Sequence, residues 1–259
     1  MESPSPLRSP RPSPPAISIR QAVEEGWAAF SSAPIPFVAF SGVAGGINLI
    51  CQLAIGHLSS HRITPFGQPD GTVDLLLLVG WMGWGISNLW LAVGLLHGAD
   101  TALAHGRPKL SRMLRPDARA MLRGAGTLGL VLLVLAVIAR LGQASAWLMA
   151  LLQPALAGLP LLAGLAVGVY LATDQVLCLP IAVLAEVNPL RAFREGRRAI
   201  DPHWLQALGL TLVLALVVLA GFLVLLVGLS VALPVATCIQ VASYRQLFVE
   251  EGPDTRKLT

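Results

Sequence analysis

Runs of about twenty apolar residues recur along this chain, and a helix of that length is what crosses the hydrocarbon core of a bilayer. The 259 residues are 55% hydrophobic and only 12% charged, and the mean hydropathy is +0.71. One soluble core could not hide so much apolar surface. We therefore expect an all-α, polytopic membrane protein, because helices satisfy their own backbone hydrogen bonds in lipid.

The apolar pattern predicts six transmembrane helices. The final apolar stretch is long enough for two of them, with a tight connection near residues 228–234. A short apolar piece at 143–154 cannot cross alone, and it either extends the third span or lies on the outer surface. The predicted spans lie at about 35–57, 73–96, 124–141, within 155–185, and in the two halves of 205–249.

A short amphipathic piece precedes each pair of spans. Residues 18–30 carry apolar side chains at every third or fourth position, and the dipeptide Asn188-Pro189 is typical of a helix N-terminus. Segments starting at Ile17, Leu110 and Pro189 each give a surface piece, a break and two spans. This pattern predicts three transmembrane hairpins, each preceded by a short interfacial amphipathic helix.

The basic residues are distributed unevenly about these spans. If the amino terminus is cytoplasmic, only Arg62 and Arg140 of the 18 Lys and Arg residues fall on the outer side, as the positive-inside rule requires. We predict a multi-pass protein of a plasma or internal membrane with both termini cytoplasmic. Residues 1–16, rich in Pro, Ser and Arg, form a disordered tail, 17–249 form the six-span membrane domain, and 250–259 form a polar tail.

Arginine is concentrated in the surface segments between apolar and aromatic residues. Segments of this kind bind anionic headgroups or a partner protein, so the bilayer and its anionic lipids are expected as partners rather than nucleic acid. The residues predicted to bind lipid or a partner are Arg112, Arg115, Arg119, Arg123, Arg191, Arg194, Arg197 and Arg198.

Asp174 is the one carboxylate expected inside lipid, within the fourth span. A carboxylate in mid-span costs about 2.5–3.5 kcal/mol on insertion scales, so it is a functional candidate, a proton or cation site. Alternatively it fixes the packing of the helices through a hydrogen bond to Asn48, Asn88, Gln240 or Tyr244. The other polar residues predicted within the membrane are Asn48, Gln52, Asn88, Gln240 and Tyr244.

The sequence offers little catalytic chemistry. It contains no H-E-x-x-H, no G-x-S-x-G and no P-loop, so we expect no enzyme, no cofactor and no metal site. Cys51, Cys178 and Cys238 all lie in apolar runs and are interpreted as small packing residues. A membrane enzyme, the least favoured function, would have to draw on four residues of the outer side: His57, His61, Asp70 and Asp74.

Three stretches carry a resemblance to a known group: "ISIRQAVEEGWAAFSSAPIPFVAF", "NPLRAFREGRRAIDPHWLQALGL" and "VASYRQLF". They resemble uncharacterised bacterial six-span proteins akin to the membrane domain of glycerophosphodiester phosphodiesterases. The resemblance covers most of the chain after residue 17 and implies a six-span fold. It implies no activity, because the soluble phosphodiesterase domain is not present in this sequence.

Two functions are carried forward. The first is a non-enzymatic scaffold or accessory protein that binds anionic lipid or a membrane-protein partner through its basic interfacial helices. The alternative is a small transporter or channel that uses Asp174. Small-residue pairs at Gly42 and Gly46, and at Gly164 and Gly168, would let helices approach closely, either within the chain or in a homo-oligomer.

Overall fold

The computed structural model describes residues 17–60, 71–156 and 158–248. Within these ranges every regular element is a helix, and six helical stretches are long and apolar enough to cross a bilayer. The predicted all-α class with six candidate spans is therefore confirmed. The six stretches are Pro34–Ser60, Thr72–Leu103, Ala118–Leu151, Gly158–Leu184, Pro189–Leu223 and Val227–Phe248.

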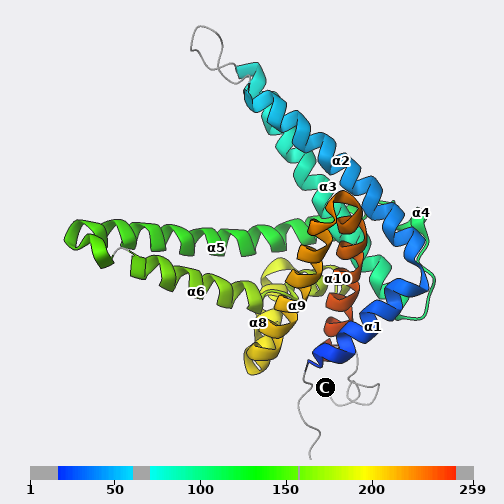
Figure 1. Cartoon of the computed structure of the whole chain (residues 1–259). Helices are drawn as coiled ribbons and strands as arrows, with labels where there is room; N and C mark the ends of the chain where they lie inside the picture. The colour runs from blue at the N-terminus through cyan, green and yellow to red at the C-terminus, as the bar shows by residue number, and fades with distance from the viewer. Residues whose placement is uncertain (1–16, 61–70, 157, 249–259) are drawn as a thin grey trace, which may run out of the picture.

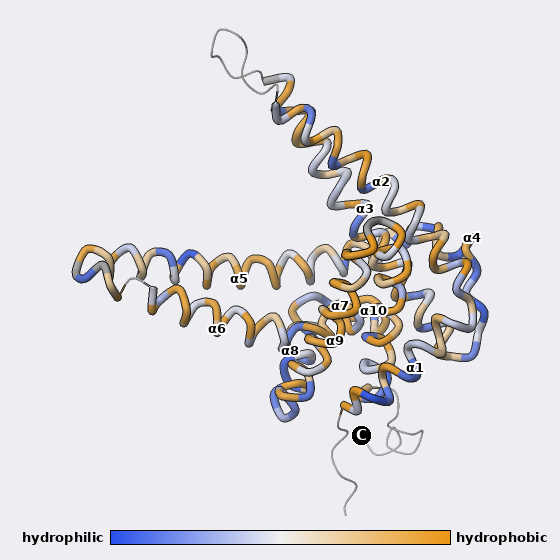
Figure 2. Tube along the Cα trace, viewed as in Figure 1, coloured by the Kyte–Doolittle hydropathy of each residue, from blue (hydrophilic) through white to orange (hydrophobic). Residues whose placement is uncertain are grey.

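Three pairs of long helices pack side by side, and the first two project from a central body that contains the third (Figure 1). They are α2 (Pro34–Ser60) with α3 (Gly71–Leu103), α5 (Ala118–Leu152) with α6 (Gly158–Asp174), and α9 (Trp204–Leu223) with α10 (Leu225–Phe248). Figure 2 shows hydrophobic residues along most of the projecting pairs. Many leucines on all three pairs are exposed, for example Leu132, Leu161 and Leu212. Such surfaces fit lipid rather than water.

The body is built around α10, which contacts α1 (Ile19–Ser32), α2, α3 and α9. The Ser18 hydroxyl accepts the Gln21 N–H at 3.4 Å and so caps α1, while the Ser18 N–H donates to Gln246 on α10 at 3.0 Å. A Cβ at Gly26 would lie 2.6 Å from the backbone nitrogen of Ile239. Because a larger residue cannot fit there, α1 packs directly on α10.

Aromatic side chains fill the space between α2 and α3. Phe37 and Phe40 are fully buried, and the Phe40 ring meets Trp90 edge to face, with ring centroids 5.0 Å apart. Gly94 leaves room for Phe40, since a Cβ there would collide with the ring. This cluster fixes the C-terminal half of α3, which carries the candidate site described below.

The turn between the fifth and sixth spans differs from the prediction. It lies at Val224, before the expected region 228–234, and Pro234 is inside α10. The cause is a close backbone approach, because a Cβ at Gly228 would collide with the carbonyl oxygen of Gly221. Two glycines therefore let the chain reverse early, and Pro234 gives up only one helical hydrogen bond.

The third span is longer than predicted. Helix α5 continues without a break to Leu152, so most of the apolar piece 143–154 extends this span. Gly142 of α5 approaches Gly164 of α6, where an added Cβ would lie 3.9 Å from the Gly164 Cα. By contrast, no described atom lies within 4 Å of a Cβ built at Gly42, Gly46 or Gly168. The close helix contact expected there is not made within the described chain.

Candidate functional site

A one-turn helix folds back over the end of α3. The Gly106 N–H donates to the Thr101 carbonyl at 2.9 Å and closes the turn after α3, and α4 (Leu110–Met113) follows. Pro116 stops α4 from running into α5, since proline has no N–H to donate. Asp117 then caps α5, accepting the N–H groups of Arg119 and Ala120 at 3.0 and 3.1 Å.

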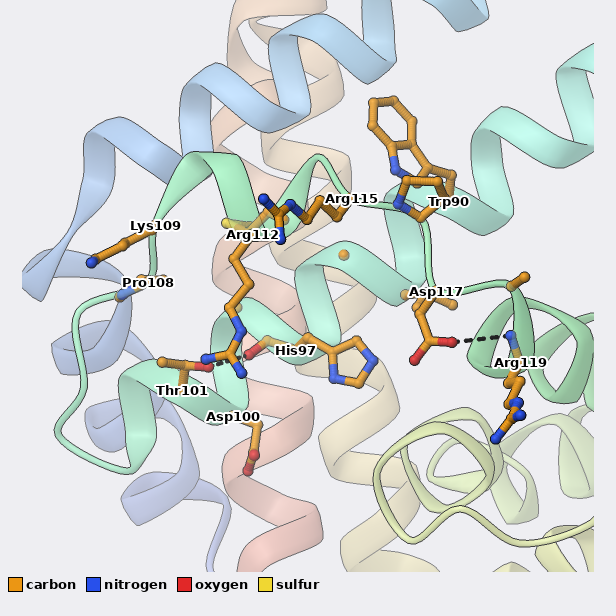
Figure 3. Close-up of a pocket in the computed structure, with 16 residues that line it drawn as sticks. Trp90, His97, Asp100, Thr101, Pro108, Lys109, Arg112, Arg115, Asp117 and Arg119 are labelled. Atoms are coloured by element: carbon orange, nitrogen blue, oxygen red, sulfur yellow. Dashed lines mark hydrogen bonds between the residues drawn. The ribbon is translucent and has the colours of Figure 1, made fainter.

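This fold-back encloses a hollow of about 640 Å³ between α3, α4 and the start of α5 (Figure 3). Its apolar lining includes Trp90, Val93 and Met113. A second hollow of about 360 Å³ adjoins it and shares four lining residues. The charged residues that line the larger hollow are Lys109, Arg112, Arg115 and Arg119 against Asp100 and Asp117.

The two carboxylates already have partners. Asp100 lies 3.3 Å from the Nη1 of Arg245, and Asp117 accepts the cap hydrogen bonds of α5. The Ala120 N–H that donates to Asp117 holds the pKa of that carboxyl below its usual value. Asp117 is therefore ionised at neutral pH, and it faces His97 across the hollow in Figure 3.

The cations, in contrast, are free to bind an anion. Within the described part of the chain, no carboxylate forms an ion pair with Lys109, Arg112 or Arg115. Figure 3 shows Arg112 reaching from α4 toward Thr101 at the end of α3. Unpaired guanidinium groups next to an apolar lining suit a molecule with a phosphate head and an apolar tail.

The predicted lipid-binding residues fall in three places. Arg112, Arg115 and Arg119 line the hollow. Arg123 does not, because it lies 3.5 Å from Glu186 in the segment after α7 (Cys178–Leu184). The remaining four lie on α8 (Pro189–Ile200), along an open surface hollow of about 670 Å³: Arg191, Arg194, Arg197 and Arg198.

Sequence reasoning missed several residues that line the hollow, Trp90, His97 and Lys109 among them. A signal was present, since Trp90, Gly94 and His97 follow one another at helical spacing just before the basic segment. What was not visible is that α4 would fold back over this face. That contact depends on the turn at Gly106 and on Pro116 together.

The predicted intramembrane polar residues form two separate groups. In the first, Asn48 Oδ1 accepts from Gln52 Nε2 at 2.9 Å and from Trp84 Nε1 at 3.1 Å. Asn88 Nδ2 donates to the Trp84 carbonyl at 2.8 Å. Only the Trp84–Asn48 bond joins α3 to α2, and the other two lie within one helix. All three occupy polar groups that a cavity around Asp174 would need.

The second group lies where the fourth span is interrupted between α6 and α7. Gln240 Nε2 donates to the Val176 carbonyl at 2.6 Å, and Tyr244 stacks on Phe248 at 5.2 Å. Asp174 is hydrogen-bonded to none of its four expected partners. Neither of its carboxylate oxygens accepts a hydrogen bond from the described residues. Its nearest cation is instead Arg197 of α8, at 3.7 Å.

The described residues contain no group of three or more His, Cys, Asp or Glu placed to hold a metal ion. His61 and Asp70, two of the four residues considered for a membrane enzyme, lie outside the described ranges. Comparison with protein-family models, with curated proteins and with solved structures found no match. The similarity to glycerophosphodiester phosphodiesterase membrane domains stays a prediction from the sequence.

Proposed function

We propose that this protein is a non-enzymatic scaffold or accessory protein of the membrane that binds anionic phospholipid at its cytoplasmic face. The observation that supports this most strongly is the hollow at the end of α3, where Lys109, Arg112 and Arg115 lie beside the apolar side chains of Trp90 and Val93 and have no ion-pair partner among the described residues. A phospholipid offers the matching pair of features, a phosphate and acyl chains, at the same depth in the bilayer.

The proposed arrangement has three transmembrane hairpins, cytoplasmic termini, and α1, α4 and α8 at the interface. Arg140 follows Arg123 by 17 residues on α5, which is about 26 Å along a helix and close to the thickness of a hydrocarbon core. Helix α8 buries Ala192, Gly196 and Ile200 and leaves all four of its arginines exposed. This division supports a position on the membrane surface.

A transporter that uses Asp174 is the second candidate. The interruption of the fourth span between Asp174 and Cys178 supports it, because broken helices often carry the ion sites of transporters. The hydrogen bonds of Asn48, Gln52 and Asn88 within α2 and α3 weigh against it.

The first test is lipid preference. Purified protein in neutral detergent should bind phosphatidylglycerol more tightly than phosphatidylcholine, and the preference should shrink when salt shortens the range of the electrostatic attraction. Native mass spectrometry or a fluorescent-lipid titration measures it. Inorganic phosphate, added as a competitor, distinguishes a lipid site from a site for free anions. It should displace the bound phosphatidylglycerol only weakly if the site recognises the whole lipid. Equal affinity for the two lipids at low salt would refute the proposal.

A further inference from the structure

The interrupted fourth span contains a charge cluster that anionic-lipid binding does not use. Asp174 ends α6 with its side chain 0% exposed, and neither of its oxygens accepts a hydrogen bond within the described chain. The neighbouring Gln175 is likewise buried, with both polar side-chain atoms unpaired. A helix break that buries an unsatisfied carboxylate in a membrane protein is costly unless something neutralises it.

One arginine side chain in this cluster forms ion pairs with two carboxylates. The Arg197 Nε lies 3.7 Å from Asp174 and 3.6 Å from Asp201, which belongs to the short turn Asp201–His203 after α8. Tyr170 of α6 donates its hydroxyl to Asp201 at 2.9 Å, and the Tyr170 ring stacks on Trp204. When all three charged groups are ionised, the cluster carries a net charge of −1.

The two carboxylates differ in how well their negative charge is stabilised. The Asp201 side chain is 44% exposed and accepts a hydrogen bond, whereas the Asp174 side chain is fully buried and has no hydrogen-bond donor among the described residues. No other charged side chain among the described residues forms an ion pair with Asp174. Helix α10 places the neutral Gln240 and Tyr244 near the break, and neither is hydrogen-bonded to Asp174. We therefore expect Asp174, rather than Asp201, to bind a proton, which changes the net charge of the cluster from −1 to zero.

We propose that Asp174 is an intramembrane proton-binding site, reached from the cytoplasmic face through Arg197 and Asp201. The Arg197 side chain is 52% exposed, so the cluster joins the buried carboxylate to the aqueous side. Gly196 packs α8 against this break, with an added Cβ only 3.7 Å from the Gln175 Oε1. When Asp174 takes up a proton, Arg197 turns to Asp201 alone, and the contact between α8 and the fourth span weakens.

Infrared spectroscopy of the protein in nanodiscs tests this directly. At about pH 5.5, more than one unit above the ordinary aspartate pKa of about 3.9, exposed carboxylates remain largely ionised. The native protein should show a carboxylic acid C=O band that Asp174→Asn lacks. Glu24→Gln, which removes an exposed carboxylate paired with Arg20 at 2.8 Å, should keep the band. The proposal would be overturned if the native protein and Asp174→Asn gave the same spectrum at every pH between neutral and mildly acidic.

Two further variants make the test independent of any loss of folding in Asp174→Asn. Arg197→Gln removes the cation, so the band should persist to a pH at least about one unit higher than in the native protein. In Asp201→Asn, Arg197 pairs with Asp174 alone and stabilises its negative charge, so the band should appear only at lower pH. Shifts in the same direction, or no shift in either variant, would also overturn the proposal.

Discussion

Replacing Lys109, Arg112 and Arg115 together with Gln should weaken the binding of phosphatidylglycerol by about 100-fold. Each basic residue near an anionic surface contributes about 1 kcal/mol, and a loss of about 3 kcal/mol corresponds to roughly that factor. All three line both hollows beside α4 and have no carboxylate partner among the described residues. A titration with fluorescent lipid in neutral detergent measures the change.

The charge-matched control removes three arginines from α8 instead, as Arg191→Gln, Arg194→Gln and Arg198→Gln. Arg191 is already paired with Glu195 at 2.6 Å, and the surface hollow beside these arginines is open along α8. At physiological salt we expect a loss of less than about tenfold, because exposed charges are screened. Equal losses in the two triple variants would mean that net charge, rather than the hollow at α3, governs binding.

Replacing Phe40 with Ala should destabilise the protein by about 3–5 kcal/mol, the usual cost of deleting a buried aromatic ring. Phe40 is 0% exposed, packs edge to face on Trp90, and occupies the space left by Gly94. Its loss opens a cavity where α2, α3 and α4 meet, so the hollow should also lose its shape. Thermal unfolding in detergent measures the stability.

The matched control is Phe222→Ala at the end of α9. Phe222 is 66% exposed on the apolar surface, so the substitution leaves no cavity. We expect a shift in the unfolding temperature several times smaller than that of Phe40→Ala. Similar shifts for the two variants would show that Phe40 is not packed as described.

Local features of this fold were predictable from the sequence. The six spans follow from apolar runs whose length is set by bilayer thickness. The N-cap positions of Ser18 and Asn188 follow from residue types that favour helix N-termini, although only the Ser18 side chain makes a capping hydrogen bond. Both depend on a few neighbouring residues, so no knowledge of the tertiary structure was required.

The remaining features depend on contacts between distant segments. The contact of Arg197 with Asp174 joins α8 to the end of α6, and the early turn at Val224 depends on Gly221 meeting Gly228. Helical periodicity places Arg197 on a surface helix but cannot reveal which buried carboxylate it meets. Likewise, the basic segment predicted an anionic partner, but the hollow requires α4 to fold back on α3.

Photo-crosslinking with a phosphatidylglycerol that carries the reactive group in its headgroup tests the lipid site most directly. Peptide mapping should place most of the crosslinks in residues 97–119, around His97, Arg112 and Arg115. An excess of phosphatidylglycerol should suppress them, while phosphatidylcholine should not. Crosslinks spread evenly over the cytoplasmic ends of all helices, or concentrated on α8, would contradict a specific site at the end of α3.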